Sequence, residues 1–320
     1  MQCSSKLRLY RYAAVSIRLA YACPCNSVRS ARTNCSNTTR TVLQSRAGVQ
    51  CMSRFSFLSG KTVVITGSSR GIGRETAHIC VEAGARVVIH GRNEAKLNEV
   101  AAALLEKGGV VRTVVGDICD PQTAVDLKQA ADELSGCDIL INNAGTSMRG
   151  PFSDIRADVL ESVMRTNVIG SAVSTQTFLA DLISVRGSVI FVSSVSGMRG
   201  FPGISIYSAA KMALTALAQS IRAETSATGL HVGIMYVGFT ENDPDKEIYN
   251  ADGSIMHSKR KHDMTQRDVA AEILLLAGRR KYRRILTPKG WLLLTLDRLA
   301  PRLVDHIINR SGGRFHSLLK

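Results

Sequence analysis

The sequence predicts an α/β protein with a single doubly wound parallel sheet of about seven strands, covered by helices on both faces. Short apolar, β-branched runs alternate with segments of helical periodicity, and the first runs recur about every 25 residues. Strands buried on both faces are expected to be apolar throughout rather than alternating, as these runs are. The regular spacing is that of βαβ units with right-handed crossovers.

The predicted elements follow one another without an internal repeat or a low-complexity linker. Strands are expected at 62–66, 87–90, 110–115, 139–142, 189–193 and 232–237, with a short seventh at 285–286. Helices are expected at 73–83, 94–106, 121–134, 207–225 and 265–277, with one long helix through 156–184. We therefore expect one folded domain over 54–286, with an N-terminal extension (1–53) and a C-terminal extension (287–320).

Composition excludes two broad classes of protein. Hydrophobic residues make up 45% of the 320 residues, enough to offset the entropy of ordering the chain, so disorder throughout is excluded. No window holds the ~18 uninterrupted apolar residues of a membrane-spanning helix, so a polytopic membrane protein is excluded as well.

The net charge of +15 is concentrated at the two ends of the chain. Residues 1–60 contain nine Lys and Arg and no Asp or Glu, and residues 257–320 contain fifteen basic residues against five acidic ones. The segment between them has more acidic than basic residues. A nucleic-acid-binding protein is expected to carry its positive charge on the folded body, so no nucleic-acid partner is predicted.

The N-terminal extension is rich in Arg and Ser, lacks acidic residues and has apolar residues at helical spacing between Leu7 and Tyr21. These are the properties of an organellar transit peptide, which would direct the protein to mitochondria or another organelle. Two alternatives stay open: an unstructured tail, or an over-long reading frame that truly starts at Met52. Without a transit peptide we expect a cytoplasmic or peripherally membrane-associated protein. A secretory signal is less well supported, because Arg11 and Arg18 interrupt the apolar stretch.

Five of the eight cysteines lie within the N-terminal extension. The other three, Cys80, Cys119 and Cys137, are far apart and in apolar surroundings, which predicts buried, reduced thiols rather than a disulfide framework or a zinc site. His257 and His262 are not accompanied by ligands at a suitable spacing. No metal site is therefore expected.

The C-terminal extension follows a basic run at 279–284 and is amphipathic. Apolar residues from Trp291 to Ile308 are interrupted by Asp297, Arg298, Arg302 and Asp305, so this segment does not predict a membrane span. It could lie on an anionic membrane surface, or pack on its own core or on a partner subunit. Packing is slightly favoured, because tail helices that cover their own protein are common.

A glycine-rich turn follows the first predicted strand and precedes a helix. Glycines let the backbone turn sharply and approach a pyrophosphate, while the helix N-terminus offers free N–H groups and a partial positive charge. The spacing is G-x-x-x-G-x-G and not the G-x-G-x-x-G of the common dinucleotide fingerprint. Its position still predicts a dinucleotide site. The expected contacts are Gly67, Ser69, Arg70, Gly71, Ile72 and Gly73.

The second strand ends in His90-Gly91-Arg92, without the acidic residue that would bind a ribose 2′-hydroxyl. Arg92, together with Arg70 in the glycine-rich turn, is instead placed to pair with a 2′-phosphate. NADP(H) is therefore the predicted cofactor, with NAD(H) as the alternative.

Catalytic candidates follow the fifth predicted strand. Ser194 comes directly after that strand, and Tyr207 and Lys211 lie four residues apart, on one face of the next helix. A phenol has a pKa of about 10, too high for ready proton transfer near neutrality, and a neighbouring ammonium stabilises the phenolate and lowers that pKa. Tyr207 can then act as the general acid or base while Ser194 hydrogen-bonds the reacting oxygen.

Taken together, these motifs resemble the short-chain dehydrogenase/reductase family over about residues 58–285. The resemblance rests on the glycine-rich turn, on Asn142-Asn143-Ala144-Gly145 after the fourth strand, and on Ser194, Tyr207 and Lys211, in the order typical of the family. It implies a Rossmann-fold NAD(P)(H) enzyme with an Asn-Ser-Tyr-Lys tetrad, usually a homodimer or homotetramer.

The resemblance also implies roles for further residues. Asn167 matches the family asparagine that helps to hold a proton-relay water near the lysine, and Asp117 matches the aspartate that contacts the adenine ring. The remaining cofactor contacts that it implies are Ile118, Asn143, Ala144, Gly145, Tyr207, Lys211, Gly238 and Thr240.

One segment departs from the family pattern. After the sixth strand the family usually has Pro-Gly and, four residues past that glycine, Thr, whereas this chain has Val237-Gly238 and Asn242. Asn can still hydrogen-bond a carboxamide or a phosphate, so cofactor binding is expected to survive. The polar segment that follows, 241–264, is expected to be a long loop over the substrate pocket.

The leading hypothesis is an NADPH-dependent carbonyl reductase, reversible as an alcohol dehydrogenase. Its basic, amphipathic tail points to a lipophilic ketone or secondary alcohol, such as a sterol, a retinoid or a long-chain lipid. A 3-oxoacyl group on acyl carrier protein or CoA is the alternative substrate, because a basic rim would also suit an acidic carrier. A non-catalytic NADPH sensor or scaffold and a membrane-surface interaction protein are alternatives of other classes, and neither explains a phenol paired with a lysine.

Overall fold

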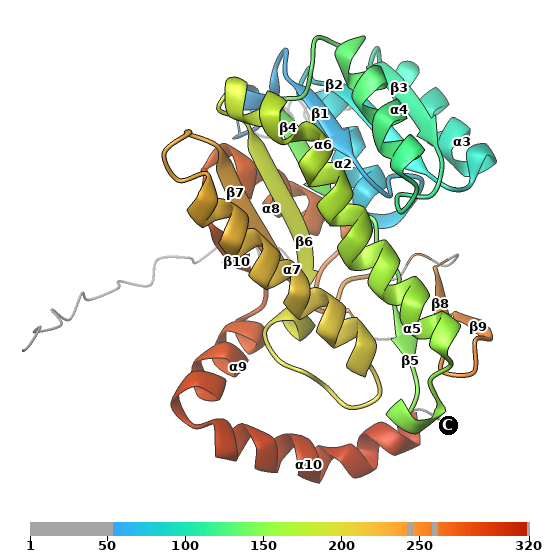
Figure 1. Ribbon diagram of the computed structural model, residues 1–320, viewed down its shortest axis with the longest axis vertical. Coiled ribbons are helices and arrows are strands. Elements are labelled where there is room, and N and C mark those ends of the chain that lie inside the picture. The colour runs from blue at the N-terminus through green and yellow to red at the C-terminus, as the bar shows by residue number, and fades with distance from the viewer. Residues whose placement is uncertain (1–53, 242, 244–245, 258–261, 319–320) are drawn as a thin grey trace, which may run out of the picture. The chain divides into compact units, whose positions relative to one another are not determined.

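The computed structural model describes residues 54–241, 243, 246–257 and 262–318. Its main sheet has seven strands in the order β10-β7-β6-β4-β1-β2-β3, and every neighbouring pair is parallel (Figure 1). The strands are β1 (Thr62–Ile65), β2 (Arg86–Gly91), β3 (Val110–Val115), β4 (Ile139–Asn142), β6 (Ser188–Ser194), β7 (His231–Val237) and β10 (Arg283–Ile285). The predicted fold class is confirmed, and each predicted strand overlaps an observed one.

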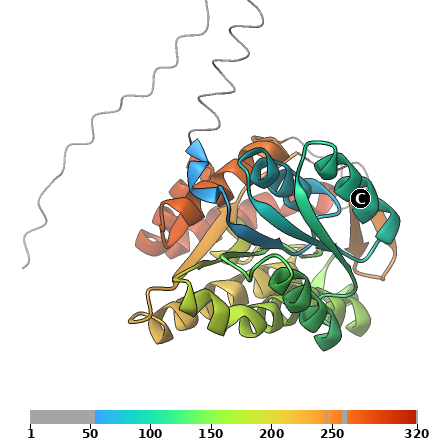
Figure 2. The ribbon, with the colours of Figure 1, turned by 90° about the horizontal axis from the view of Figure 1, so that it is seen from above.

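Helices cover both faces of this sheet, as Figure 2 shows from above. One layer consists of α2 (Gly71–Glu82), α3 (Glu94–Leu105) and α8 (Gln266–Gly278), and the other of α4 (Pro121–Asp132), α6 (Gly170–Ser184) and α7 (Ser205–Glu224). Because successive strand residues point to opposite faces, Val63 and Ile65 of β1 join the core under the first layer and Val64 joins the core under the second.

Local capping explains where several helices begin. The Asn93 side chain accepts a hydrogen bond from the Lys96 backbone N–H ahead of α3, and the Asp120 side chain caps α4, whose first residue is proline. Thr265 and Asp268 form a reciprocal capping box at the start of α8. These short polar side chains satisfy N–H groups that the helix itself leaves unpaired.

The single long helix predicted through 156–184 is interrupted. The structure has α5 (Ala157–Met164), a π-helical segment η3 (Arg165–Ile169) and then α6. Asn167 lies within η3, and its side-chain amide donates to the Val163 carbonyl and to the Thr146 carbonyl, each at 2.8 Å. A π turn accommodates one extra residue and often marks a functional position. Apolar periodicity alone does not reveal it.

The segment expected to be a loop over 241–264 contains two strands. β8 (Glu247–Asn250) pairs in parallel with β5 (Met148–Arg149) and antiparallel with β9 (Ile255–His257). Ile248 and Met148 are buried, which anchors this small sheet to the body. Short 3₁₀ helices lie before β1, after β5 and after β6: η1 (Ser56–Leu58), η2 (Phe152–Asp154) and η4 (Val195–Gly197).

The C-terminal extension forms two helices, α9 (Pro288–Leu299) and α10 (Pro301–Leu318), which lie at the lower end of the molecule in Figure 1. Gly290 and Val304 are buried, so part of the extension packs on the body, in line with the favoured prediction. Several apolar side chains of the same helices are nevertheless exposed. Among the described residues, no helix has both the length and the apolar composition required to cross a bilayer.

Candidate active site

The predicted site residues gather at the carboxyl ends of the central strands. The glycine-rich turn follows β1, residues 143–145 follow β4, Ser194 ends β6, and Gly238 follows β7. These strands are parallel neighbours, with Ser194 paired in register with Val237. In an open parallel sheet, the carboxyl edge is where ligands bind.

The glycine-rich turn packs tightly against the segment after β4. Gly67 has φ +67° and Gly71 has φ +60°, in the left-handed region that favours glycine. A Cβ on Gly67 would lie 2.7 Å from the Ala144 Cα, and a Cβ on Gly73 would lie 2.3 Å from the Gly67 carbonyl oxygen. Only glycine allows this approach, and the result is a shallow, backbone-lined turn at the N-terminus of α2.

Asn143 and Thr66 hold that turn in place. The Asn143 amide donates to the carbonyls of Thr66 and Gly67 at 3.0 and 2.8 Å, and the Thr66 hydroxyl accepts from the backbone N–H groups of Asn143 and Ala144 at 3.0 Å each. The Asn143 side chain, expected to contact the cofactor, therefore positions the turn through these bonds.

His90 is a third support of the turn, and sequence reasoning did not single it out. Its Nδ1 accepts from the Gly67 backbone N–H at 3.2 Å, and its Nε2 donates to the Gly116 carbonyl at 3.1 Å. Burial lowers the pKa of His90 to about 4, against the opposing effect of the Gly116 carbonyl, so the ring is neutral at physiological pH. The one available signal was a histidine at the end of a buried strand.

The expected adenosine end lies at β2 and β3. Partial burial acts to raise the pKa of Asp117, but hydrogen bonds from Cys119 and the charges of Arg92 and Arg165 outweigh it and lower that pKa. Arg92 and Arg165 are therefore both close enough to Asp117 for their charges to act on its carboxylate. Ile118 is buried against Gly170, so its side chain belongs to the core.

The other predicted residues of the turn are also placed at this end. Ser69 lies under Gly91, where an added Cβ would come within 2.9 Å of the Ser69 hydroxyl oxygen. Arg70 is the N-cap residue of α2, and Ile72 packs against the hydrophobic core. The groups that this turn offers to a ligand are therefore mainly backbone groups.

Asp243 occupies the N-terminus of α2. Its carboxylate accepts a hydrogen bond from the Gly71 backbone N–H at 3.1 Å, so a chain segment that follows β7 reaches across to the first helix. A helix N-terminus favours negative charge, which explains why a carboxylate settles there. No sequence pattern distinguished Asp243 from the other acidic residues of the 241–264 segment.

Tyr207 and Lys211 lie on α7 as predicted, with the Lys211 Nζ 5.7 Å from the centroid of the Tyr207 ring. The Lys211 side chain is buried, and its Nζ donates to the Val192 carbonyl at 3.0 Å. Burial, and after it the charge of Lys246, lowers the pKa of Lys211 to about 7. Lys246 is therefore a second cation near Lys211, and the sequence analysis did not identify it.

Asn167 completes the predicted tetrad from the π-helical segment. Its Oδ1 is buried and has no hydrogen-bond partner among the described residues. A Cβ on Gly145 would lie 2.6 Å from this Oδ1 and 3.4 Å from the Lys211 Nζ, so both groups face the space that the missing side chain leaves. A buried unpaired acceptor beside a lysine is the environment in which an ordered water is expected.

Ser194 stands at the junction of β6 and η4, where its hydroxyl accepts from the Ser196 backbone N–H at 3.2 Å. The adjacent Ser193 hydroxyl donates to the Lys211 carbonyl at 3.0 Å and ties β6 to α7. On the far side of the site, the Thr240 hydroxyl donates to the Gly238 carbonyl at 3.4 Å. Asn242, which replaces the expected threonine, lies outside the described residues.

The three cysteines outside the N-terminal extension are buried thiols, as predicted. Cys80, Cys119 and Cys137 are free and buried, and burial raises the pKa of each thiol. Within the described ranges, no group of three or more His, Cys, Asp or Glu residues could hold a metal ion. The predicted N-terminal extension, residues 1–53, lies wholly outside the described residues.

Comparison with known proteins identifies the family of the chain. The short chain dehydrogenase family model matches residues 61–253. The chain is 34% identical to the bovine (Bos taurus) dehydrogenase/reductase SDR family member 7B over 77% of its length and 80% of that protein. It is 32% identical to the 3-dehydrosphinganine reductase of Danio rerio over 60% of its length and 61% of that protein. The chain belongs to the short-chain dehydrogenase/reductase family and is an oxidoreductase.

Solved structures share the fold. A short-chain dehydrogenase/reductase from Burkholderia phymatum, solved with NAD, superposes with a TM-score of 0.68 at 21% identity, over 77% of this chain and 95% of that one. An alcohol dehydrogenase from Thermococcus sibiricus, solved with 5-hydroxy-NADP, gives a TM-score of 0.62 at 20% identity, over 71% and 95%.

Proposed function

We propose that this enzyme is an NADPH-dependent carbonyl reductase that transfers a hydride to a ketone and, in reverse, oxidises a secondary alcohol. The observation that carries the proposal is the buried Lys211, whose Nζ lies 5.7 Å from the centroid of the Tyr207 ring and faces, together with Asn167 Oδ1, the space beside Gly145. A phenol next to a buried lysine serves proton transfer and has no evident use in a protein that merely binds a nucleotide.

The residues at the carboxyl edge of the sheet fit a nicotinamide dinucleotide. The contacts of Gly67 and Gly73 leave a turn that any larger side chain would fill, and the N-terminus of α2 lies behind it. Arg92 and Asp117 lie together where the adenosine would be held. The proposed cofactor contacts are those of the sequence analysis, with Asn143 acting through the turn.

The cofactor, when bound, supplies the hydride. Tyr207 donates a proton to the carbonyl oxygen of the ketone, and Ser194 hydrogen-bonds that same oxygen. The Lys211 ammonium stabilises the phenolate that Tyr207 becomes. Asn167 Oδ1 accepts from a water that returns a proton toward Lys211, which is the use we assign to this otherwise unpaired acceptor.

NADP preference rests on Arg92 and Arg70. Neither the end of β2 nor the glycine-rich turn offers a carboxylate to a ribose 2′-hydroxyl, and two guanidinium groups would pair with a 2′-phosphate. NAD(H) remains the alternative cofactor.

A lipophilic ketone or alcohol is the proposed substrate. The similarity to a 3-dehydrosphinganine reductase supports a long-chain compound, as does the exposed apolar surface of the C-terminal helices. A 3-oxoacyl group on acyl carrier protein or CoA is the second candidate, favoured by Lys246 near the catalytic lysine. A homodimer or homotetramer and peripheral contact with a membrane through α9 and α10 are also proposed, as is organellar targeting by residues 1–52.

The experiment compares NADPH and NADH oxidation against lipophilic ketones, small soluble ketones and oxoacyl thioesters. Wild-type protein is expected to prefer NADPH, and Arg92→Ala to lose roughly 10-fold or more of that preference, since a hydrogen bond to a charged group contributes ~1.5–3 kcal/mol. Arg112→Ala is the matched control, because Arg112 is exposed on β3 and pairs with Glu133. Tight NADPH binding with no turnover of any ketone would favour a sensor.

A further inference from the structure

We propose that α9 and α10 form a docking surface for an anionic lipid bilayer, and that Arg199 connects this surface to the loop between Ser194 and Tyr207. The inference extends the membrane contact proposed above, and its test needs no catalytic turnover. If the reductase assignment failed, the membrane-docking proposal would be unaffected. If membrane docking failed, the reductase assignment would be unaffected.

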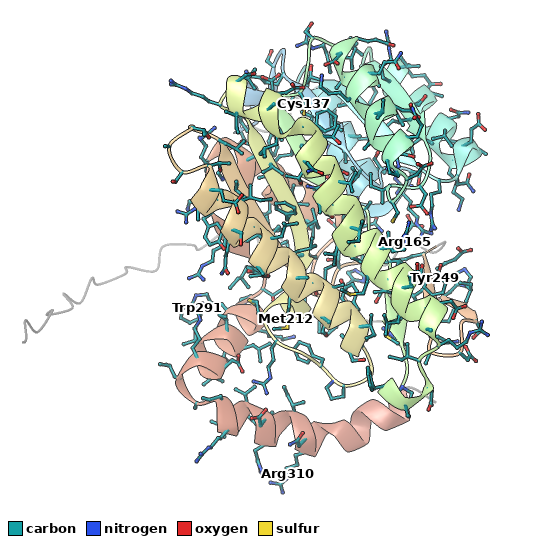
Figure 3. The ribbon with its side chains drawn as sticks, in the orientation of Figure 1. Cys137, Arg165, Met212, Tyr249, Trp291 and Arg310 are labelled. Carbon is teal, nitrogen blue, oxygen red and sulfur yellow. The ribbon has the colours of Figure 1, made fainter. Side chains whose placement is uncertain are left out.

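Five large apolar side chains on these two helices are exposed. They are Trp291 (62%), Leu292 (53%), Leu299 (79%), Leu303 (49%) and Ile307 (51%). Soluble proteins rarely gather so many large apolar side chains on one short exposed segment unless something covers them. Leu303 and Arg310, seven residues apart in α10, share one side of the helix, about 100–120° around its axis from the buried Val304, and Arg310 projects away from the body in Figure 3.

The charge on this surface is basic because the carboxylates of its two acidic residues are paired with one cation of the body. The C-terminal extension contains only two acidic residues, Asp297 and Asp305, and both form ion pairs with Arg199 of the body. The basic residues Lys289, Arg298, Arg302 and Arg310 are exposed. Apolar side chains interleaved with cations complement an anionic membrane surface, where each basic residue strengthens binding about five-fold.

A second copy of the chain is a poorer occupant. A two-fold interface formed by this surface would place the exposed arginines of one copy against the same patch on the other, and like charges at an interface are unfavourable. Anionic lipid headgroups neutralise those charges while the acyl chains accept the apolar side chains. The bilayer therefore satisfies both features at once.

Arg199 gives the docking surface a connection to the reacting groups. It lies in the loop between η4 and α7, and this loop faces α9 and α10 in Figure 1. Ser194 directly precedes η4, and Tyr207 lies in the first turn of α7. A Cβ on Gly290 of α9 would come within 2.9 Å of Val195, at the start of the same loop. Docking thus brings the loop beside the catalytic residues to the bilayer surface, which suits a membrane-resident substrate.

Trp291 supplies a specific probe, since it is the sole tryptophan of the chain. With full-length protein, we expect its fluorescence to shift to the blue and to be quenched by brominated lipids in phosphatidylcholine vesicles containing phosphatidylserine, and not in phosphatidylcholine alone. Leu299→Glu with Leu303→Glu should lower vesicle affinity roughly 10-fold or more. Val125→Glu, at an exposed apolar position on α4, should leave it unchanged.

Arg199→Gln tests the connection. Releasing both carboxylates should reduce affinity for anionic vesicles several-fold, and adding Asp297→Asn and Asp305→Asn should restore it. Co-sedimentation with vesicles without any change in Trp291 emission would assign binding to another segment and overturn the proposal. A dimer that Leu299→Glu with Leu303→Glu dissociates, with vesicle affinity unchanged, would identify a subunit interface and overturn it too.

Discussion

The cofactor side and the substrate side of the site are held together in different ways. On the cofactor side, Thr66, His90 and Asn143 fix a glycine-rich turn through hydrogen bonds to backbone groups. On the substrate side, the contacts join side chains far apart in the sequence, such as Arg199 with Asp297. Backbone geometry demands particular residues at particular spacings, whereas such side-chain pairs can form from many sequences. The glycine-rich turn is therefore readable in the sequence, whereas an ion pair such as Arg199 with Asp297 is not.

The largest effect is expected from a substitution that removes the proposed proton donor and keeps the contacts on both sides of the site. Tyr207→Phe takes away the hydroxyl and keeps the ring beside Lys211, so turnover should fall roughly 10²–10⁴-fold, the usual contribution of a general acid. Equilibrium titration should show a much smaller change in the dissociation constant for NADPH, of about 10-fold at most, because only one of the proposed cofactor contacts is lost. Retained turnover would show that another group donates the proton.

A pair of glycine substitutions compares how well the two sides of the site tolerate an added methyl group. Gly73→Ala would place a Cβ 2.3 Å from the Gly67 carbonyl oxygen and should lower the free energy of unfolding by about 2–3 kcal/mol, because the obstacle is backbone. Gly200→Ala, in the loop beside η4, meets nothing within 4 Å and should change it by less than about 0.5 kcal/mol. Urea unfolding of both variants gives the comparison, and equal effects would contradict it.

Lys211 links the two sides, and its ionisation should appear in the stability of the protein. Burial and the charge of Lys246 lower its pKa to about 7 in the folded state, while an unfolded lysine has a pKa near 10.4. Between these values the unfolded chain binds more protons, so stability rises with pH, by at most ~1.4 kcal/mol per unit from this group. Lys211→Met should remove that rise.

The measurement is urea unfolding of wild type and Lys211→Met at pH 7, 8 and 9. The variant is expected to be relatively most stable at the lowest pH and to lose that advantage as the pH increases. Lys246→Gln is the companion variant, since removing its charge should raise the pKa of Lys211 and move the window upward. Parallel stability curves for wild type and Lys211→Met would disprove the buried, pKa-shifted lysine.

The smallest expected effect concerns Asp243, a residue of the segment after β7 that hydrogen-bonds to the cofactor side of the site. Its carboxylate occupies the N-terminus of α2 and must leave before a phosphate can bind there. Asp243→Asn should therefore tighten NADPH binding by up to ~10-fold, since hydrogen bonds involving a charged group contribute ~1.5–3 kcal/mol, part of which the asparagine retains.

Calorimetric titration of the dissociation constant measures this effect without turnover. Asp252→Asn is the matched control, because its carboxylate bonds within its own turn, to Ser254. Weaker NADPH binding in Asp243→Asn would show instead that Asp243 supports the bound state.

Most of the fold followed from the sequence, because apolar runs and helical periodicity report burial directly. Tyr207, Lys211 and the glycine-rich turn followed as well, since their spacing along one element is fixed. His90 and Lys246 did not, because their roles depend on neighbours that only the folded chain brings near. The strands β8 and β9 were taken for loop, since they have only four and three residues and lie in a segment that is polar overall.

The π-helical segment that contains Asn167 sets a limit on engineering this enzyme for heat resistance. Deleting one residue within Arg165–Ile169 would let α5 and α6 run on as a regular α-helix with better hydrogen bonds. The same deletion would rotate the residues before it about 100° around the helix axis relative to those after it, so the Asn167 amide would no longer face Gly145 and Lys211. Along this helix, added thermostability and catalysis are in direct opposition.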